Sequence, residues 1–396
     1  MDNLIYLDYG ATSFPKPEEV YDQMGTFYRN YGVNPGRSGY DLCMVAGTMV
    51  EDTRKLLTRF FNGTDYNRLI FSLNATDALN LAIFGLLQPG DHAITTTIEH
   101  NSVLRPLYHM SSQNNVEVDY IPFDRDGFVH PDDIKAKVKR NTRLVVVNHG
   151  SNVIGAVQPI AEIGSLCRQR GIPFLIDSSQ TAGKIPVDLE AQNIDVIAFT
   201  GHKSLLGPMG TGGLYVREGI EIRHTRAGGT GVRSAVRAHL DEYPYRLEYG
   251  TGNLPGIAGL NAGVKWIEKT GMHAIHDLET RLLKKLRDGL RKIDGVTMYC
   301  QDNLKDHIAV LSFNIDGIEA MNVGTMLDVD YNIACRTGLH CAPLVHERLG
   351  TDKLHGAVRF GIGPANTEQQ IDTAIEAVRE IALSRKRAVS PSAVVG

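Results

Sequence analysis

One lysine and one cysteine in this sequence have neighbours that favour covalent chemistry. Lys203 stands in "TGHKSLLGPMGTG", directly after an apolar run that predicts a strand. Open α/β sheets bind ligands at the carboxyl ends of their strands, where a lysine can form a Schiff base with a carbonyl cofactor. Cys341 stands in "RTGLHCAP", next to His340 and after Arg336, and such neighbours hold a thiol as thiolate. We predict a covalent cofactor site and a nucleophilic thiol; a surface lysine and a structural cysteine are the alternatives.

Asp177 ends the apolar run "PFLID", upstream of the lysine. A carboxylate there either caps a helix or keeps a pyridine nitrogen protonated, which pyridoxal phosphate (PLP) needs in order to act as an electron sink. Gln180, three residues later, is placed to hydrogen-bond the phenolic oxygen of the same ring. Together with Lys203, these residues favour PLP over a helix cap.

A phosphate site is available at the start of a predicted helix. In "LIFSLNATDALNLAIFG" the N–H groups after Asn74 and the hydroxyl of Thr76 lie at a helix N-terminus, which suits an anion, and a plain cap is the alternative. His100 follows another strand and either lies against an aromatic ring or is an ordinary hydrogen-bonded histidine. Asn152 follows a third strand, where turn formation competes with a ligand role.

Two other chemistries are disfavoured by residue spacing. A P-loop needs glycine directly before the lysine and again five residues earlier, and His202 and Ala198 occupy those places. A zinc site built from Cys335, His340 and Cys341 lacks the usual ligand spacing, so we predict no metal. Cys335 lies in a predicted strand and is assigned to the core.

Bulk composition excludes several classes of protein. The chain has 396 residues, 42% hydrophobic and 22% charged, with a formal net charge of -4, which predicts a globular protein of two domains without a basic face for nucleic acid. The first residues, "MDNLIYLDYGATSF", lack the positive and then apolar regions of a signal peptide, and no later run approaches the length needed to cross a membrane. Five cysteines without C-x-x-C pairs fit a reducing compartment. We expect a cytoplasmic protein with neither nucleic acid nor membrane as partner.

Apolar runs alternate with amphipathic stretches over the first two thirds of the chain, which is typical of an α/β layer with a mainly parallel sheet. After "YGTGNLPGIAGL" a mostly helical stretch leads into a smaller α+β region. We therefore expect a large domain over 15–255, a small domain over 256–385 joined by 1–14, and a flexible tail over 386–396.

Seven motifs resemble those of the class V aminotransferase superfamily, and within it the cysteine desulfurases and selenocysteine lyases. They are "NAT", "EHNS", "SNVIG", "DSSQ", "TGHKSLLGPMGTG", "GTGN" and "RTGLHC", in this order. The resemblance runs from Leu7 to about Leu383. It implies the aspartate aminotransferase-like fold, called PLP-dependent fold type I, with a seven-stranded sheet in the large domain and the cysteine loop in the small one. It also implies a homodimer with shared active sites.

The resemblance implies roles for individual residues around the cofactor. Lys203 would hold PLP as a Schiff base, Asp177 would pair with its pyridine nitrogen, Gln180 with its phenolic oxygen, and His100 would stack on the ring and move protons. The residues implied for the phosphate and the rest of the cofactor are Ala75, Thr76, Thr200, His202 and Asn152, with Gly250 and Thr251 from the partner subunit.

Substrate contacts are implied in the same way. Arg359, in "AVRFGIG", would bind the substrate carboxylate together with Asn152, because a planar guanidinium suits a bidentate contact; a structural ion pair is the alternative. Asn34 and Arg37, in "NPGRSGYDL", would also contact the substrate.

The implied reaction converts L-cysteine to L-alanine. Cys341 would attack the sulfur of the PLP-bound substrate and carry it as a persulfide to an acceptor protein, in sulfur metabolism such as iron–sulfur cluster assembly. Selenocysteine lyase, cysteine sulfinate desulfinase and another class V lyase or aminotransferase are the alternatives. A non-catalytic binding protein is disfavoured because Lys203, Asp177 and Cys341 occur together. Leu339 stands where close relatives often carry a second histidine.

Overall fold

The chain folds into two units, which a computed structural model describes over residues 3–36, 39–299 and 302–389. The larger unit comprises Pro15–Gly150 and Gln158–Ala274. The smaller unit comprises Met1–Phe14, Ser151–Val157 and Ile275–Gly396. This division differs from the expected domains in two places: residues 256–274 group with the larger unit, and Ser151–Val157 groups with the smaller one.

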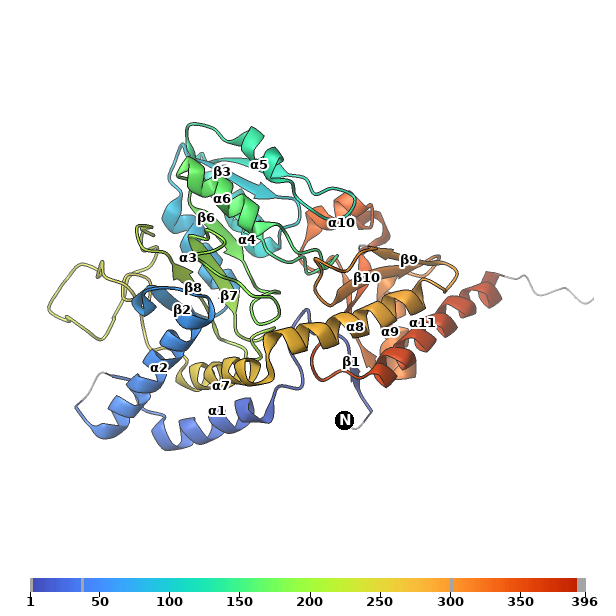
Figure 1. Ribbon diagram of the computed structural model, residues 1–396, viewed down its shortest axis with the longest axis horizontal. Coiled ribbons are helices and arrows are strands. Elements are labelled where there is room, and N and C mark those ends of the chain that lie inside the picture. Colours follow the sequence, from blue (N-terminus) through green and yellow to red (C-terminus); the bar gives the residue numbers. More distant parts are fainter. Residues whose placement is uncertain (1–2, 37–38, 300–301, 390–396) are drawn as a thin grey trace, which may run out of the picture. The chain divides into compact units, whose positions relative to one another are not determined.

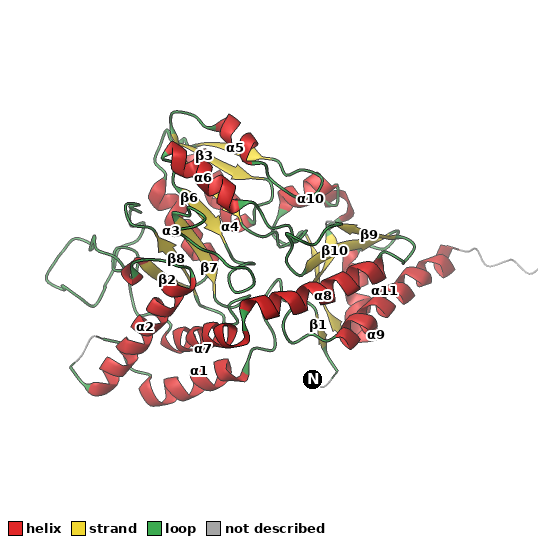
Figure 2. Cartoon of the chain, viewed as in Figure 1, coloured by secondary structure: helices red, strands yellow, loops and turns green. Residues whose placement is uncertain are grey.

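A seven-stranded sheet, with strand order β2-β8-β7-β6-β5-β3-β4, forms the centre of the larger unit (Figure 2). Strands β3 to β7 pair in parallel, and β8 is antiparallel to both of its neighbours. This confirms the expected mainly parallel sheet. The strands are β2 (Leu69–Ser72), β3 (His92–Thr96), β4 (Glu117–Ile121), β5 (Thr142–Asn148), β6 (Phe174–Asp177), β7 (Val196–Thr200) and β8 (Gly212–Val216).

The central strands are buried along their length because both of their faces are covered. All residues of β3, β6, β7 and β8 are buried. One core cluster combines residues of these strands with α3 (Ala75–Leu86) and α4 (Asn101–Asn114). Helices α5 (Pro131–Lys137) and α6 (Ile160–Arg170) pack on each other, and α6 ends at Gly171, whose φ of 64° suits glycine.

Helix α7 (Leu254–Thr270) packs against α1 (Glu18–Tyr31) and α2 (Asp41–Phe60), and Figure 1 shows α1 and α7 side by side. These contacts explain why residues 256–274 belong with the larger unit. A short 3-10 helix, η1 (Tyr66–Arg68), leads into β2.

The smaller unit is built on a four-stranded antiparallel sheet in the order β12-β13-β10-β9, with a separate parallel pair of β1 and β11. Its core joins Leu286, Phe313, Val323, Phe360 and Val378 with other apolar side chains of the strands and helices. This is the α+β unit expected from the sequence. Its elements are β1 (Ile5–Tyr6), α8 (Met272–Leu290, which begins in the larger unit), β9 (Val296–Tyr299), β10 (Val310–Ile315), α9 (Ala320–Tyr331), β11 (Ile333–Ala334), β12 (Arg336–Gly338), α10 (Pro343–Leu349), η2 (Asp352–Leu354), β13 (Ala357–Gly361) and α11 (Glu368–Val389).

Details at the ends of some elements differ from the sequence-based expectation. Cys335 lies between the short strands β11 and β12 rather than inside one strand, and it packs against the core of the smaller unit. Helix α11 continues to Val389, into the range expected as a tail, and residues 390–396 lie outside the described ranges. Within those ranges, no helix is both long and apolar enough to span a membrane.

Candidate active site

In the larger unit, the candidate residues gather where parallel strands end. The last residues of β5 and β6, Asn148 and Asp177, are register partners, and Asp177 also pairs with Ala198 of β7. Parallel strands bring their carboxyl ends to one edge of a sheet, so the loops after β5, β6 and β7 leave from that edge. The topology therefore places Asp177 and the Lys203 turn at the same edge.

Asp177 is buried, and its Oδ1 accepts hydrogen bonds from the N–H and the hydroxyl of Ser179, at 2.9 Å and 2.5 Å. Residues 178–195, all of them described, form turns and no helix. The helix-cap interpretation of Asp177 therefore fails, while the pyridine-pairing interpretation stays consistent with a buried, oriented carboxylate.

A second buried carboxyl group, Glu99, lies on the same edge. Its Oε1 accepts hydrogen bonds from the hydroxyl of Thr96 at 2.6 Å and from the N–H of Asn148 at 2.9 Å. Burial, with a smaller contribution from the nearby charge of Asp177, raises the pKa of Glu99 to about 8. Near neutral pH the structure therefore keeps one carboxyl group protonated close to Asp177.

The N-termini of α3 and α4 are joined by hydroxyl groups. The Oγ of Ser102 lies 2.8 Å from Oγ1 of Thr76 and 2.7 Å from Nδ1 of His100. His100 caps α4, and its Nδ1 accepts from the N–H of Ser102 at 3.0 Å. Because Nδ1 accepts, the neutral ring carries its proton on Nε2 and is held in one orientation.

Helix α3 begins as the sequence indicated, with the Asn74 side chain accepting from the N–H of Asp77 at 2.9 Å. Ala75 is buried in its first turn, and Thr76 follows it. The capped end of a twelve-residue helix with a hydroxyl beside it meets the requirement for an anion site.

Lys203 lies in a tight turn after β7. The N–H of Gly207 donates to the Gly201 carbonyl at 2.8 Å, and a Cβ at position 201 would lie 2.1 Å from the Thr211 hydroxyl, so only glycine fits there. Thr200, the last residue of β7, is buried.

Lys16, which the sequence analysis did not single out, donates from Nζ to the carbonyl of His202 at 3.3 Å. Burial lowers the pKa of Lys16 to about 8. Burial, and then the charges of Lys203 and Lys16, lower the pKa of His202 to about 4. Two lysines therefore flank a neutral imidazole in this turn.

The other expected residues of the larger unit lie in loops. Gln180 is buried, and its carbonyl accepts from the Ser204 hydroxyl at 3.1 Å, which ties the loop after β6 to the Lys203 turn. Asn34 is exposed between α1 and α2, and Arg37 lies outside the described residues. Gly250 and Thr251 are exposed near the end of the long segment between β8 and α7.

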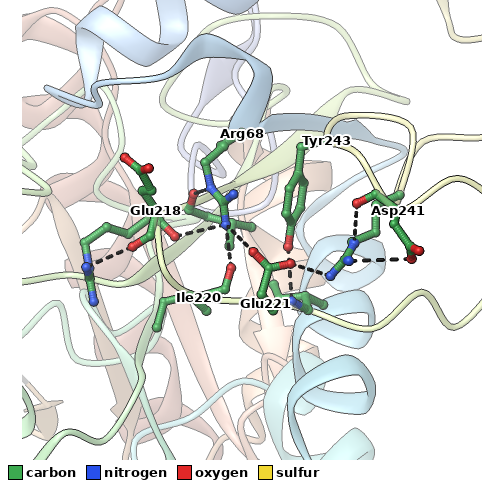
Figure 3. Close-up of polar contacts among 10 residues, drawn as sticks. Arg68, Glu218, Ile220, Glu221, Asp241 and Tyr243 are labelled. Carbon is green, nitrogen blue, oxygen red and sulfur yellow. Dashed lines mark hydrogen bonds and ion pairs between the residues drawn. The ribbon is translucent and has the colours of Figure 1, made fainter.

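That segment is anchored by Arg68, as Figure 3 shows. The Arg68 guanidinium lies 4.2 Å from the centre of the Tyr243 ring and donates to the carbonyl of Val216 at 2.8 Å. Glu221 pairs with Arg68 at 3.6 Å and with Arg246. These contacts hold the two ends of the segment that leads to Gly250.

The smaller unit carries Cys341 in a strained loop between β12 and α10. His340 and Cys341 have φ of 49° and 57°, in the left-handed region, although neither is glycine. Nη2 of Arg336 lies 3.8 Å from Sγ of Cys341. The His340 ring is buried, and its nitrogens contact His346 and the Arg336 carbonyl. Of the two neighbours proposed to stabilise the thiolate, Arg336 is the one that contacts the sulfur.

Arg359 lies on β13 and is buried at 1% exposure, paired through Nη2 with Asp8 at 2.6 Å. Its Nη1 donates to the carbonyl of Asn152 at 3.1 Å, and the Asn152 side chain donates to the His340 carbonyl at 2.8 Å. Among the described residues, no group hydrogen-bonds to Arg359 Nε or to Asn152 Oδ1. Arg359 thus forms an ion pair with Asp8 and also has a buried N–H donor at Nε. The structural ion pair and the substrate-carboxylate contact are therefore compatible interpretations.

The described part of the chain contains no cluster of three His, Cys, Asp or Glu residues that could hold a metal ion.

Comparison with known proteins decides the family. The class-V aminotransferase model matches residues 5–373. A "Probable cysteine desulfurase" of Pyrococcus abyssi is 33% identical over 96% of this chain and 95% of its own length, and a "Cysteine desulfurase" of Shigella flexneri is 30% identical over 96% and 93%. The chain belongs to the class-V aminotransferase family.

Solved structures agree with this family. The apo structure of a cysteine desulfurase from Thermococcus onnurineus superimposes with a TM-score of 0.88 at 32% identity, covering 97% of this chain and 96% of that one. A cysteine desulfurase from Escherichia coli gives 0.86 at 27% identity, covering 97% and 96%. The fold expected from the motifs is confirmed.

Class-V aminotransferases depend on PLP, and the residues of the larger unit fit this cofactor. A buried carboxylate suits the pyridine nitrogen, the lysine turn suits the aldehyde, and the capped start of α3 suits the phosphate. Asp177, Lys203 and Thr76 would therefore hold PLP, which supplies an electron sink when bound.

Several candidate residues became visible only in the structure. Glu99 belongs to the "EHNS" motif and Lys16 contacts the His202 carbonyl, but nothing in the sequence marks Glu99 as buried or Lys16 as half-buried. The role of Asp8 comes from its contact with Arg359, more than three hundred residues away in the sequence. The role of His346 comes from its contact with His340, at the other end of a loop. For Glu99 the available signal was its place as the first residue of the "EHNS" motif.

Proposed function

We propose that this chain is a PLP-dependent L-cysteine desulfurase that forms L-alanine and transfers sulfur to Cys341. The observation that supports it most directly is the arrangement of Cys341, whose sulfur lies 3.8 Å from the Arg336 guanidinium in a loop held by other side chains. A thiolate beside a cation is a nucleophile, and the family supplies the electron sink.

The proposed reaction balances without an oxidant. Cys341 thiolate attacks the sulfur of the substrate, a sulfur–sulfur bond forms, and the bond between the substrate sulfur and its β-carbon breaks. The electron pair left on that carbon is taken up with a proton, which yields alanine. The Cys341 persulfide then passes its outer sulfur to a thiol of an acceptor protein or reductant.

Individual side chains receive roles under this proposal. Lys203 would attach PLP covalently, Asp177 would pair with its ring nitrogen, Gln180 would pair with its phenolic oxygen, and His100 would stack on the ring and move protons. Ala75, Thr76, Thr200 and His202 bind the phosphate, with Gly250 and Thr251 of a second copy of this chain.

The substrate carboxylate is assigned to Arg359 and Asn152. The buried Nε of Arg359 is a donor with no hydrogen-bond partner among the described residues, and such a group costs free energy unless a ligand satisfies it. Asn34 and Arg37 are further proposed substrate contacts, and a homodimer in the cytoplasm with a separate sulfur-acceptor protein completes the proposal.

The experiment that tests this function is alanine release from L-cysteine with a reductant present. Wild type and Cys341→Ala are compared, with Cys335→Ala as the matched control, because burial raises the pKa of Cys335 to about 12 and makes it a poor nucleophile. We expect alanine from wild type and Cys335→Ala and a loss of about a hundredfold or more in Cys341→Ala.

Equal rates in all three proteins would contradict sulfur transfer through Cys341 and favour cleavage of selenocysteine or a sulfinate. No alanine from any protein that carries its PLP absorbance would rule out cysteine desulfuration and leave another class-V reaction.

A further inference from the structure

The Cys341 loop carries backbone strain that its surroundings must hold. Two consecutive residues that are not glycine, His340 and Cys341, adopt left-handed φ values, which cost roughly 1–2 kcal/mol each. Such a conformation persists only where contacts fix it on several sides. The Asn152 amide holds the His340 carbonyl from one side.

A chain of three polar side chains holds the loop from the other side. Oγ1 of Thr351 lies 2.8 Å from Nδ1 of His346, and Nε2 of His346 lies 3.2 Å from Nδ1 of His340. Nε2 of His340 lies 3.5 Å from the carbonyl oxygen of Arg336. All three side chains are buried, and the two rings lie with centres 5.3 Å apart.

Both imidazoles are neutral. Burial lowers the pKa of His346 to about 4, and burial with the charge of Arg359 lowers that of His340 to about 2. Each ring therefore carries one N–H, and one proton lies between the rings. The groups at the two ends of the chain decide which ring carries it.

The Arg336 carbonyl only accepts, so Nε2 of His340 must be the N–H end of that ring. Nδ1 of His340 then accepts from Nε2–H of His346, and Nδ1 of His346 accepts from the Thr351 hydroxyl. In the opposite direction a bare nitrogen lone pair would face the Arg336 carbonyl, which is unfavourable. The bonds thus run in one direction, from Thr351 to Arg336.

We propose that His346 and Thr351 are positioning residues for the reactive thiol: through His340 they hold the Arg336 backbone, and with it the guanidinium beside Cys341 Sγ. Arg336 links this series of hydrogen bonds to the thiol. Its carbonyl accepts the last hydrogen bond of the series, and its guanidinium contacts the sulfur of Cys341. This inference rests on the proposed function only in taking Cys341 as the working nucleophile.

The test compares two alkylating reagents on the PLP-loaded full-length protein without substrate. Iodoacetate and iodoacetamide both react with the thiolate, so the ratio of their rates cancels thiolate fraction and access and reports the positive charge at the sulfur. Alkylation of Cys341 is followed by mass spectrometry at low ionic strength, where such a charge is weakly screened. The buried Cys43 and Cys167 serve as internal controls for local unfolding.

Two matched pairs carry the test, with Arg336→Gln as the reference for loss of the charge. Thr351→Val removes only the hydroxyl, and Thr351→Ser keeps it. His346→Leu removes the ring bonds, and His346→Gln keeps a donor for His340 and an acceptor for Thr351. We expect the iodoacetate-to-iodoacetamide ratio to fall about threefold or more in Thr351→Val and His346→Leu, toward Arg336→Gln, and to stay near wild type in Thr351→Ser and His346→Gln.

A wild-type ratio in Thr351→Val or His346→Leu, with Cys43 and Cys167 still protected, would overturn the inference, and so would a fall that the conservative variants do not rescue. If His346→Leu does not fold, the Thr351 pair decides alone. Alanine release is measured separately. If the protein lacks desulfurase activity but shows the expected ratios, the proposed function is rejected and the positioning role of His346 and Thr351 is retained.

Discussion

The two units hold their candidate residues by different means. In the larger unit, Asp177 and the Lys203 turn follow directly from the ends of paired strands, so the backbone of the sheet brings them to one edge. In the smaller unit, Cys341 and Arg359 depend on side chains that bind one another, namely Asp8, Asn152, His340, His346 and Thr351. A backbone-built site tolerates single changes outside it, whereas a network of buried polar groups is disturbed by each change within it.

The largest expected effect is chemical and lies in the larger unit. Lys203→Ala removes the amine proposed to attach PLP, so covalent, borohydride-reducible cofactor should disappear and alanine release should fall by about a thousandfold or more. The fold should stay intact, because the turn is set by the backbone bonds of Gly201 and Gly207. Mass spectrometry after borohydride treatment gives the answer, and a reduced PLP adduct on the variant would reject the assignment of Lys203.

Next comes loss of a buried charge in the smaller unit. Asp8→Asn leaves the Arg359 guanidinium buried without its anion, and we expect the free energy of unfolding to fall by about 3 kcal/mol. The matched change in the larger unit is Glu248→Gln, which removes the partner of Arg54 at 2.7 Å. Urea unfolding measures both. Only Asp8→Asn should also raise the KM for cysteine. An equal rise of KM in both variants would contradict the proposed contact between Arg359 and the substrate.

The acid response should differ between the units by a smaller amount. Burial is the largest cause that lowers the pKa of His149 and His202 in the larger unit to about 4, and that of His307 and His346 in the smaller unit to about 4 and of His340 to about 2. Burial also lowers the pKa of His92 in the larger unit, but the charge of Asp119 opposes this shift. Below pH 6.5 the unfolded chain takes up protons that these folded rings do not, so stability is lost as pH falls toward 4.

Each such histidine costs about 1 kcal/mol between pH 6.5 and 5.5, so the smaller unit should loosen first. Hydrogen exchange resolved by peptide at pH 7, 6 and 5 measures this. Faster loss of protection in the larger unit would contradict the ordering.

The smallest change in stability near pH 5 is expected at Glu99. Its raised pKa of about 8 means that the unfolded chain loses the proton near 4.5 while the folded chain keeps it, so this group lowers stability as pH rises from 4.5 to 8. Glu99→Gln resembles the protonated acid and should change the free energy of unfolding by less than about 1 kcal/mol near pH 5. Urea unfolding at pH 5 and pH 8 should show that the variant loses less stability than wild type over this range. An equal loss would show that Glu99 does not have a raised pKa in the folded protein.

Much of the larger unit was predictable from the sequence because it depends on local order along the chain. The alternating apolar runs became β2 to β8, and Asp177 at the end of one strand and Lys203 shortly after another took the positions that the strand ends imply. The capped start of α3 was readable for the same reason, since Asn74 and Asp77 are three residues apart.

The contacts of the smaller unit were not readable in this way. His340 was expected beside the thiolate, but its ring is turned to His346, and no local pattern shows where a side chain points. The Asp8–Arg359 pair joins residues at opposite ends of the chain, and burial decides its strength. Cys300 and Arg37 lie outside the described residues.

The smaller unit is drawn from three separate stretches of the chain, and this bears on how the protein is made. Strand β1 pairs with β11 through Ile5 and Ile333, and Asp8 waits for Arg359, which is synthesised about 350 residues later. The sheet of the larger unit is complete once Val216 has been translated. During synthesis, when domains fold in the order in which they emerge, the cofactor half can therefore form well before the thiol half. A truncated or stalled chain would then present the proposed PLP site without Cys341 in its loop, and the sulfur transfer proposed here would begin only in finished molecules.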